Sequence, residues 1–173
     1  KIGAHPSYPD REGFGRRSMQ LTPEELRLSL TLQVEALKGV LALEGLAMTH
    51  VKPHGALYND AAKNLERARI ICAASLGAII VGPAGSAIET AAKEAGLAFA
   101  AEGFVDRLYL ASGALCPRSE DGAIIESIEA RAAQALAIAK GEEINAREGK
   151  IIVSAQTLCI HSDTAGSAET AHA

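Results

Sequence analysis

The chain contains no tryptophan, and aromatic residues of all kinds make up only 3% of its 173 residues. Hydrophobic residues still account for 48% of the chain, so small and aliphatic side chains must form most of the core. Such side chains let helices lie close to strands, which favours a fold with helices packed on a sheet. The length corresponds to a single domain, residues 1–173, or to part of a larger one.

Cysteine and basic charge are also scarce. Cys72, Cys116 and Cys159 are odd in number, widely spaced and not part of a CxxC pair. This pattern favours reduced thiols in a cytoplasmic protein over a disulfide framework. The net charge of −4 argues against a nucleic-acid-binding protein, which usually carries a basic face.

No long apolar run is free of interruptions. Residues 70–88 carry no charge, but Gly77, Gly82, Pro83 and Gly85 divide this stretch. We therefore expect a helix end, a buried strand and two turns here rather than a membrane span. No signal peptide is recognised either.

Strand and helix patterns alternate along the sequence. Thr22, Pro23 and Glu25 form a capping box with proline at the first helical position, which marks a helix start. The expected strands are residues 2–4, 48–52, 78–81, 97–101 and 157–160. The expected helices are residues 22–45, 56–75 (with a break near Asn64), 86–95 and 127–140. A hairpin is expected at residues 143–146 and 150–153, and an irregular segment at residues 105–125. Such alternation implies a parallel sheet covered by helices. Polar residues end at least four strands, which favours a (β/α) barrel over an open sheet with one crevice.

The end of the second expected strand carries three polar side chains. His50, Lys52 and His54 alternate with other residues, so in an extended strand they share one face. Lys52 is costly to bury unpaired, so it needs either an anionic ligand or a carboxylate such as Glu102 or Asp106. If Lys52 binds an anionic ligand, it has a role in function; if it pairs with a carboxylate, it helps to hold the barrel together. His50 is expected to have a structural role.

The loop after the first expected strand carries a second set of candidates. His5, followed by Asp10, could serve as a base, a metal ligand or a loop anchor. Arg16 and Arg17 match carboxylate and phosphate oxygens in bidentate geometry. This loop could therefore clamp an acidic ligand, or it could be a solvated basic turn.

The remaining candidates follow the fourth and last expected strands. Loops as long as the irregular segment are more often functional than idle. Its Asp106, Arg107 and Arg118 could close over a ligand or form a surface ion pair. His161 and Asp163 could add another imidazole and carboxylate. A Ser-His-Asp triad is not indicated, because no GxSxG motif occurs.

Six motifs carry a family resemblance. They are IGAHPSYPD (residues 2–10), GFGRR (13–17), VKPHGALY (51–58), FVDRLY (104–109), PRS (117–119) and CIHSD (159–163). With these motifs in this order, the chain resembles the LamB/YcsF family, also known as the A subunit of 5-oxoprolinase, over essentially its whole length. The VKPHGALY and GAHPSYPD stretches are the specific ones.

The resemblance implies a fold and a reaction. The fold is a distorted seven-stranded (β/α) barrel related to polysaccharide deacetylases and some glycoside hydrolases. The reaction is the ATP-dependent opening of 5-oxoproline (pyroglutamate) to glutamate, together with two partner subunits, B and C. Family members begin with an Asp-rich strand and a Cys-Gly-Phe-His-type segment, both absent here. We therefore expect a barrel that is incomplete at both ends, because without those strands it cannot close.

The residue patterns and the resemblance together give the candidate site. The expected catalytic residues are His5, Lys52, His54, Asp106 and His161, and the expected substrate- or phosphate-binding residues are Asp10, Arg16, Arg17, Tyr58, Arg107, Arg118 and Asp163. In this hypothesis Lys52 and Arg17 hold a phosphate or carboxylate, and His54 or His5 activates water. ATP is the expected co-substrate, and an Asp orients a His or holds Mg²⁺.

Two other functions stay open. One is a divalent-metal hydrolase resembling the carbohydrate deacetylases, with His5, His54 and an Asp as metal ligands and no need for ATP. The other is a non-catalytic binding or scaffold subunit, with catalysis on its partners. A small-molecule substrate and a cytoplasmic location are expected in each case, and a homo-oligomer is a further possibility.

Overall fold

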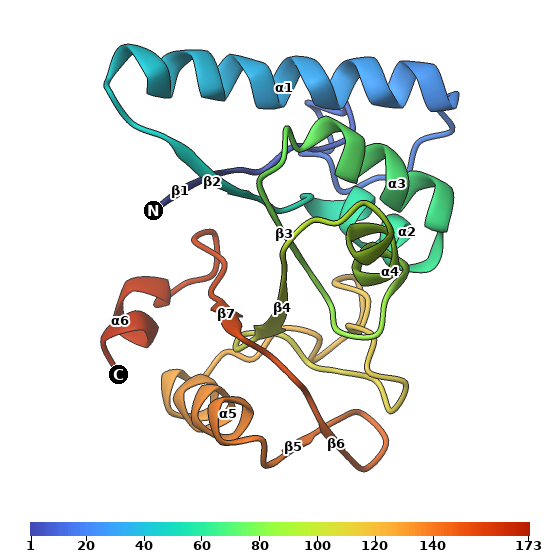
Figure 1. The fold of residues 1–173 in the computed structure, drawn as a ribbon. Helices are drawn as coiled ribbons and strands as arrows, with labels where there is room; N and C mark the ends of the chain where they lie inside the picture. The colour runs from blue at the N-terminus through green and yellow to red at the C-terminus, as the bar shows by residue number, and fades with distance from the viewer. The chain divides into compact units, whose positions relative to one another are not determined.

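The computed structural model describes all 173 residues, and the chain forms two compact units, Lys1–Ala100 and Ala101–Ala173 (Figure 1). Strands and helices alternate in the order that the sequence predicts. Residues 70–88 contain a helix end, a buried strand and the start of another helix, as expected. None of the helices has both the length and the apolar character that crossing a membrane requires.

Five parallel strands form the sheet. They are β1 (Ile2–Ala4), β2 (Met48–Val51), β3 (Ile79–Gly82), β4 (Phe99–Phe104) and β7 (Thr157–Cys159). Neighbouring strands follow the order β1-β2-β3-β4-β7. The remaining strands, β5 (Glu143–Asn145) and β6 (Lys150–Ile152), form the expected antiparallel hairpin. The α/β class with a parallel sheet is thus confirmed, while the seven-stranded barrel stays a prediction.

Four helices belong to the first unit. They are α1 (Pro23–Leu43), α2 (Gly55–Lys63), α3 (Leu65–Ala74) and α4 (Ala87–Glu94). The predicted capping box starts α1, since Thr22 Oγ1 accepts from Glu25 N (3.2 Å) and the Glu25 carboxylate accepts from Thr22 N (2.8 Å). The predicted break separates α2 from α3, because Asn64 is extended at φ −130° and caps α3 with its side chain.

The core of the first unit is aliphatic. α1 packs against α3 (Figure 1), and its buried face carries Leu26, Leu30 and Val34 at four-residue spacing. These side chains join Ile71 of α3 and several alanines in one buried cluster, in which Tyr8 is the one aromatic residue. This composition confirms that small and aliphatic side chains replace aromatic ones in the packing.

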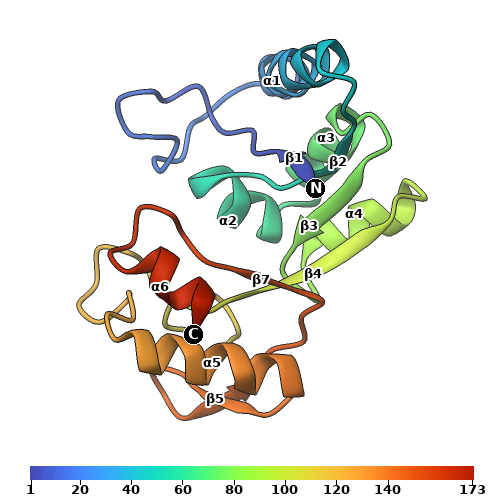
Figure 2. The same ribbon diagram turned by 90° about the vertical axis from the view of Figure 1, so that its left-hand side faces the viewer.

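The second unit is arranged around α5 (Ile128–Lys140). α6 (Ser167–His172) and β5 contact this helix (Figure 2). Residues 105–125 hold only isolated bridges and turns, so the irregular segment is confirmed. Its course is fixed by backbone and side-chain hydrogen bonds rather than by regular structure.

Two buried polar side chains of α5 hold the backbone around it. Arg131 donates to Ile125 O (2.6 Å), which lies at the end of the irregular segment. Gln134 donates to Phe104 O (2.8 Å), at the last residue of β4, and to Arg107 O (2.9 Å), just beyond this strand. α5 therefore sets the backbone position from which Asp106 projects.

The α1 face supplies a stability test. Leu30 is fully buried and Leu28, on the same helix, is 53% exposed. We expect Leu30→Ala to lower the free energy of unfolding by about 2–5 kcal/mol, because it removes buried methyl groups and leaves a cavity. Leu28→Ala should change it by less than about 0.5 kcal/mol. Urea unfolding followed by circular dichroism measures both, and equal effects would contradict the packing of α1.

Candidate functional site

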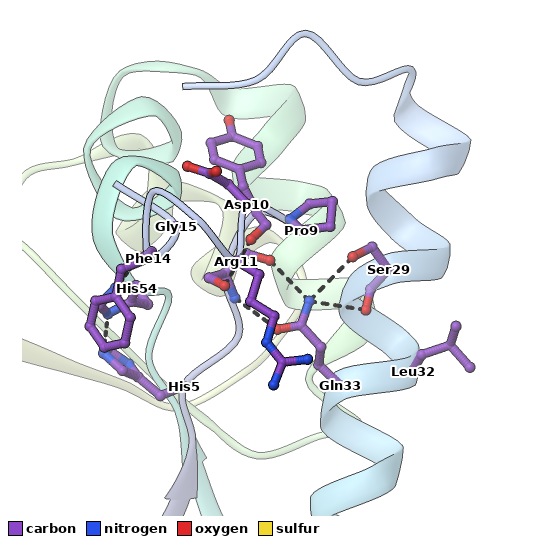
Figure 3. A pocket seen from close by; sticks show the side chains of 12 residues that line it. His5, Pro9, Asp10, Arg11, Phe14, Gly15, Ser29, Leu32, Gln33 and His54 are labelled. Atoms are coloured by element: carbon purple, nitrogen blue, oxygen red, sulfur yellow. Dashed lines mark hydrogen bonds between the residues drawn. The ribbon is translucent and has the colours of Figure 1, made fainter. Parts of the chain in front are cut away.

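The first group of candidate residues surrounds a cavity of about 630 Å³ in the first unit (Figure 3). The lining residues are His5, Ser7, Tyr8, Pro9, Asp10, Arg11, Phe14, Gly15, Ser29, Leu32, Gln33 and His54. They come from the loop after β1, from α1 and from the residue before α2. A cavity of this size is in the range of small-molecule sites. The structure thus brings the predicted His5, Asp10 and His54 to one cavity.

Backbone pairing beyond β1 and β2 places the two histidines. Lys52 N donates to Ala4 O (3.0 Å), and His54 N donates to Pro6 O (2.9 Å). The ring of His5 also contacts this backbone, with Nδ1 2.7 Å from Lys52 O. Because the two chains run together past their strands, His5 and His54 lie next to each other.

The two imidazole rings meet edge to face. His54 Nδ1 lies 3.0 Å from His5 Nε2, and the ring planes are 80° apart (Figure 3). The other nitrogen of His54, Nε2, is 2.8 Å from Phe14 O. Phe14 has a left-handed backbone at φ +53°, which is uncommon for a residue with a side chain. This strained residue directs its carbonyl group at the ring of His54.

Asp10 and Arg17 form an ion pair within the loop. Asp10 accepts from Arg17 Nε (2.9 Å) and Nη2, and from Gly13 N (3.0 Å). The hydrogen bond from Arg17 lowers the pKa of Asp10 to about 2. A Cβ atom at Gly13 would lie 2.0 Å from the Asp10 carboxylate, so a larger residue there would displace the ion pair. The carboxylate that Arg17 holds in this structure is therefore that of Asp10.

Sequence reasoning missed Gln33, which ties α1 to the loop. Gln33 Nε2 donates to Ser7 O (2.9 Å), and Gln33 Oε1 accepts from Ser7 N (2.9 Å) (Figure 3). The one signal in the sequence that could have identified Gln33 is its position between Leu30 and Val34, which are buried, because a polar residue there lies at the border of the core. Sequence reasoning also missed Arg11, which lines the cavity.

Three other candidates of the first unit lie near the ends of β2 and α2. Lys52 directly follows β2 and is partly exposed. Burial lowers the pKa of His50, and the charge of Lys52 lowers it further. The His50 ring covers Gly3, where a Cβ atom would lie 2.2 Å from it, which fits a structural role. Tyr58 is a buried residue of α2. The guanidinium carbon of Arg16 lies 5.3 Å from the centre of the Phe14 ring.

The second group lies in the second unit, around Asp106. This carboxylate is fully buried and accepts from His161 N (3.1 Å), His161 Nδ1 (2.9 Å) and Thr164 Oγ1 (3.0 Å). Because a carboxylate only accepts, Nδ1 carries the proton, and a neutral ring presents Nε2 as an acceptor. The ring also stacks on Phe104, with centroids 5.6 Å apart.

The environment of Asp106 favours its charged form. Burial raises the pKa of Asp106, but the hydrogen bonds and charge of His161, together with Thr164, outweigh burial and lower the pKa overall. The predicted Asp106 and His161 are therefore brought together as a dyad. Thr164 was not predicted, although it directly follows the CIHSD motif.

The arginines of the irregular segment have different surroundings. Arg107 is buried and donates to Ala123 O (3.3 Å) and Cys116 O, so it holds the irregular segment together. Arg118 Nη1 lies 3.9 Å from Asp163 Oδ2. The structure thus joins the predicted Arg118 and Asp163 in a long ion pair.

Two of the carboxylates considered for Mg²⁺ are bonded to other side chains. Mg²⁺ that accompanies a nucleotide is usually bound by one or two carboxylates together with phosphate oxygens and water. Asp10 is bonded to Arg17, and Asp106 to His161 and Thr164. No group of three or more His, Cys, Asp or Glu residues is arranged to hold a metal ion. Asp10 and Asp106 thus already have partners in this structure, and the expected Mg²⁺ stays a prediction.

The Asp10–Arg17 ion pair can be tested by titration. Replacing Arg17 in Arg17→Gln removes the donor that lowers the Asp10 pKa to about 2, so this pKa should rise toward 3.8. Carboxyl ¹³C chemical shifts followed against pH measure it. Arg27→Gln, which removes an equal charge from the surface of α1, should leave it unchanged. An Asp10 pKa still near 2 in Arg17→Gln would contradict the assignment.

The buried dyad predicts a pH-dependent stability. The pKa of Asp106 is lower in the folded chain than its ordinary value of 3.8, so its stabilisation is present above pH 3.8 and is lost as pH falls. We expect Asp106→Asn to cost about 1.5–3 kcal/mol at pH 7, because hydrogen bonds to a charged group are lost. This loss of unfolding free energy should become smaller as the pH is lowered toward 3, which urea unfolding at several pH values measures. Asp121→Asn, at an exposed position, is the control, and a cost independent of pH would contradict this account.

The comparisons with known proteins agree with one another. The 5-oxoprolinase A subunit from Methylococcus capsulatus is 47% identical over 167 residues, covering 94% of this chain and 64% of that protein. The Bordetella pertussis protein of the same name is 46% identical over 94% of this chain and 66% of its own length. The crystal structure of a lactam utilization protein from Thermus thermophilus superposes with a TM-score of 0.88 at 42% identity, covering 99% of this chain and 70% of that one.

The chain thus spans just under two thirds of the length of these curated relatives. The sequence model of the LamB/YcsF family matches residues 1–173. On this full-length match and on relatives of 46–47% identity, the chain belongs to the LamB/YcsF family.

Proposed function

We propose that the chain belongs to the A subunit of an ATP-dependent 5-oxoprolinase, which cleaves 5-oxo-L-proline to L-glutamate as ATP is hydrolysed. The observation that carries this proposal is the 47% and 46% identity to two proteins that are named as this subunit of 5-oxoprolinase. The likeness to a protein named for lactam utilization supports it, because 5-oxoproline is a five-membered lactam.

The chemistry of this substrate accounts for the use of ATP. A five-membered lactam is a stable amide that water attacks slowly. Transfer of the terminal phosphoryl group of ATP to the amide oxygen would convert that oxygen into a leaving group. Water then adds to the carbon, and the C–N bond breaks as the nitrogen takes a proton and leaves as the amine, which gives γ-glutamyl phosphate. A second water molecule cleaves this acyl phosphate to glutamate and free phosphate. Mg²⁺ enters this proposal only as the companion of ATP.

We assign the activation of water to His161. Asp106 holds the proton on Nδ1 of this ring and fixes its orientation, so Nε2 can accept a proton from water. Asp106 is then a positioning residue, and its lowered pKa keeps it charged so that it stabilises the protonated ring. Stacking on Phe104 further restricts the rotation of the ring.

We assign the binding of a small anionic reactant to the cavity of the first unit. Arg11 lines this cavity, and a guanidinium group matches carboxylate and phosphate oxygens. Lys52, whose carbonyl oxygen contacts His5, is the second cation of this proposal. Arg17 and Arg107 have structural roles in it, because Asp10 and backbone carbonyl groups occupy their donors.

Partner subunits belong to the proposal as well. Both curated relatives carry the name of one lettered subunit of 5-oxoprolinase, which implies a complex of several chains. We propose 5-oxoprolinase subunits B and C as the partners. A cytoplasmic location would suit an enzyme that consumes ATP and keeps its three cysteines as buried free thiols.

The proposal is tested on the full-length protein combined with its partner subunits. We expect 5-oxoproline-dependent ATP hydrolysis and glutamate formation in equal amounts. His161→Gln should lower kcat about 100- to 10,000-fold with an unchanged melting temperature, since it removes a general base. His172→Gln, at an exposed position of α6, should leave kcat unchanged.

Each alternative function has its own outcome. Full activity of His161→Gln in the complex would contradict the role of the dyad and favour a scaffold subunit with catalysis on its partners. Metal-dependent release of acetate from N-acetylated sugars without ATP would replace the proposal by a deacetylase-like hydrolase. Failure of the wild-type complex to hydrolyse ATP in the presence of 5-oxoproline would overturn the proposal as a whole.

A further inference from the structure

Arg131 of α5 is a buried charge whose hydrogen-bond acceptors are all uncharged. The residue is 2% exposed, and it donates from Nε to Ile125 O (2.6 Å) and from Nη1 to Ala165 O (2.7 Å) and Thr170 Oγ1 (3.2 Å). A buried charge without an opposite charge is costly, and an apolar side chain of similar volume often fills such a place at least as stably. Filling the core therefore does not explain a guanidinium group at this position.

The acceptor at Ile125 connects Arg131 to the carboxylate side of the dyad. Ile125 N donates to Asp106 O (3.0 Å), so the residue that receives the Nε bond also holds the backbone of Asp106. About one turn further along α5, Gln134 donates to the carbonyl group of Arg107, the residue after Asp106. The backbone that carries the buried carboxylate is thus held by α5 at two points.

The acceptor at Ala165 connects Arg131 to the imidazole side of the dyad. Ala165 directly follows Thr164, whose hydroxyl group donates to Asp106 (3.0 Å) and whose backbone N–H donates to His161 O (3.1 Å). The bond between Thr164 N and His161 O closes a turn of residues 161–164. Because this turn is short and hydrogen-bonded, the position of Ala165 determines where the turn places the ring of His161.

The chain that follows this turn lies close to α5. Gly166 has a left-handed backbone at φ +74°, and a Cβ atom there would lie 3.3 Å from the side chain of Ile128 on α5. Thr170 of α6 accepts from Arg131 Nη1 and donates to Gly166 O (2.8 Å), and α6 contacts α5 (Figure 2). The glycine thus lets the chain approach the helix, and Arg131 holds it there.

The shape of the guanidinium group suits a bond to two separate segments. Nε and Nη1 lie in one plane at fixed angles, so their bonds to Ile125 O and Ala165 O fix the two segments relative to each other. Bonds from a charged donor are also stronger than bonds between neutral groups. Lysine has the charge but only one nitrogen atom, and methionine has a similar length but no donor. Substitution by each of them therefore separates charge and length from the bond to both segments.

We propose that Arg131 is a positioning residue, which holds the segment of Asp106 and the turn of His161 at the separation that the dyad requires. This inference rests on the proposed function, because Arg131 acts on the reaction only through the ring that activates water. A shift of about 1 Å in a reacting group can lower a rate about a hundredfold. Arg131 thus contributes to kcat, whereas the anionic reactant binds in the cavity of the first unit.

Kinetics of the full-length protein combined with its partner subunits test the effect on the reaction. Arg131→Met should lower kcat about 10- to 100-fold and leave KM unchanged, because the base is misplaced while the cavity is intact. Arg131→Lys should lower kcat less, because one ammonium group can still hold one of the two segments. Arg147→Met is the matched control, since this arginine of the same unit donates to Asp121 O (2.9 Å) and has no bond to the dyad. Its kcat should equal that of the wild type.

The Nδ1 proton of His161 gives a signal that a merely structural role of Arg131 would not change. In the full-length subunit without its partners, this proton should give a downfield ¹H resonance, because it is bonded to the buried carboxylate of Asp106. His161→Gln identifies the resonance by its absence. Arg131→Met should shift the resonance upfield or remove it through faster exchange with water, and Arg147→Met should leave it in place.

Two results would overturn the proposal. One is a wild-type kcat in Arg131→Met, and the other is a lowered kcat together with an unchanged His161 resonance. If Arg131→Met does not fold, the same two results in Arg131→Lys decide. The resonance is measured without turnover, so an inactive wild-type complex would overturn the proposed function and would leave the test of the link between Arg131 and the dyad intact.

Discussion

Backbone pairing between the segments that leave β1 and β2 is the constraint on which the first unit's site depends. The pairing continues beyond both strands through Lys52 N to Ala4 O and His54 N to Pro6 O. It brings together two histidines 49 residues apart in sequence and leaves their rings on the same side. The loop is joined to this pairing as well, because Ala56 N donates to Gly15 O (2.9 Å). The position of the imidazole pair thus follows from sheet geometry.

The second unit reaches a similar precision by a different route. Side chains of α5 hold the backbone at the end of β4, and Asp106 then receives both the backbone N–H and the ring of His161. A buried carboxylate is costly unless every oxygen is bonded, and here three donors satisfy it. This unit therefore depends on a polar network whose members must all be present.

Local signals in the sequence were sufficient for the element order. The capping box at Thr22 and the break at Asn64 were predictable because short-range hydrogen bonds determine them. Parallel strands also predicted which residues meet at their ends, as His5 and His54 do. The pairing of Asp10 with Arg17 and the contact of Gln33 with Ser7 were not predictable, since they depend on how an irregular loop folds onto α1. The sequence allows Asp106 as a partner for Lys52, yet the structure bonds it to His161 and Thr164.

The outer acceptors of the imidazole pair belong to the main chain, which every amino acid possesses. Replacing Lys52 or Phe14 alters a side chain but leaves the oxygen that holds His5 or His54 in the chain. The orientation of the two rings thus depends on the path of the polypeptide at these two acceptor positions, and not on the side chains there.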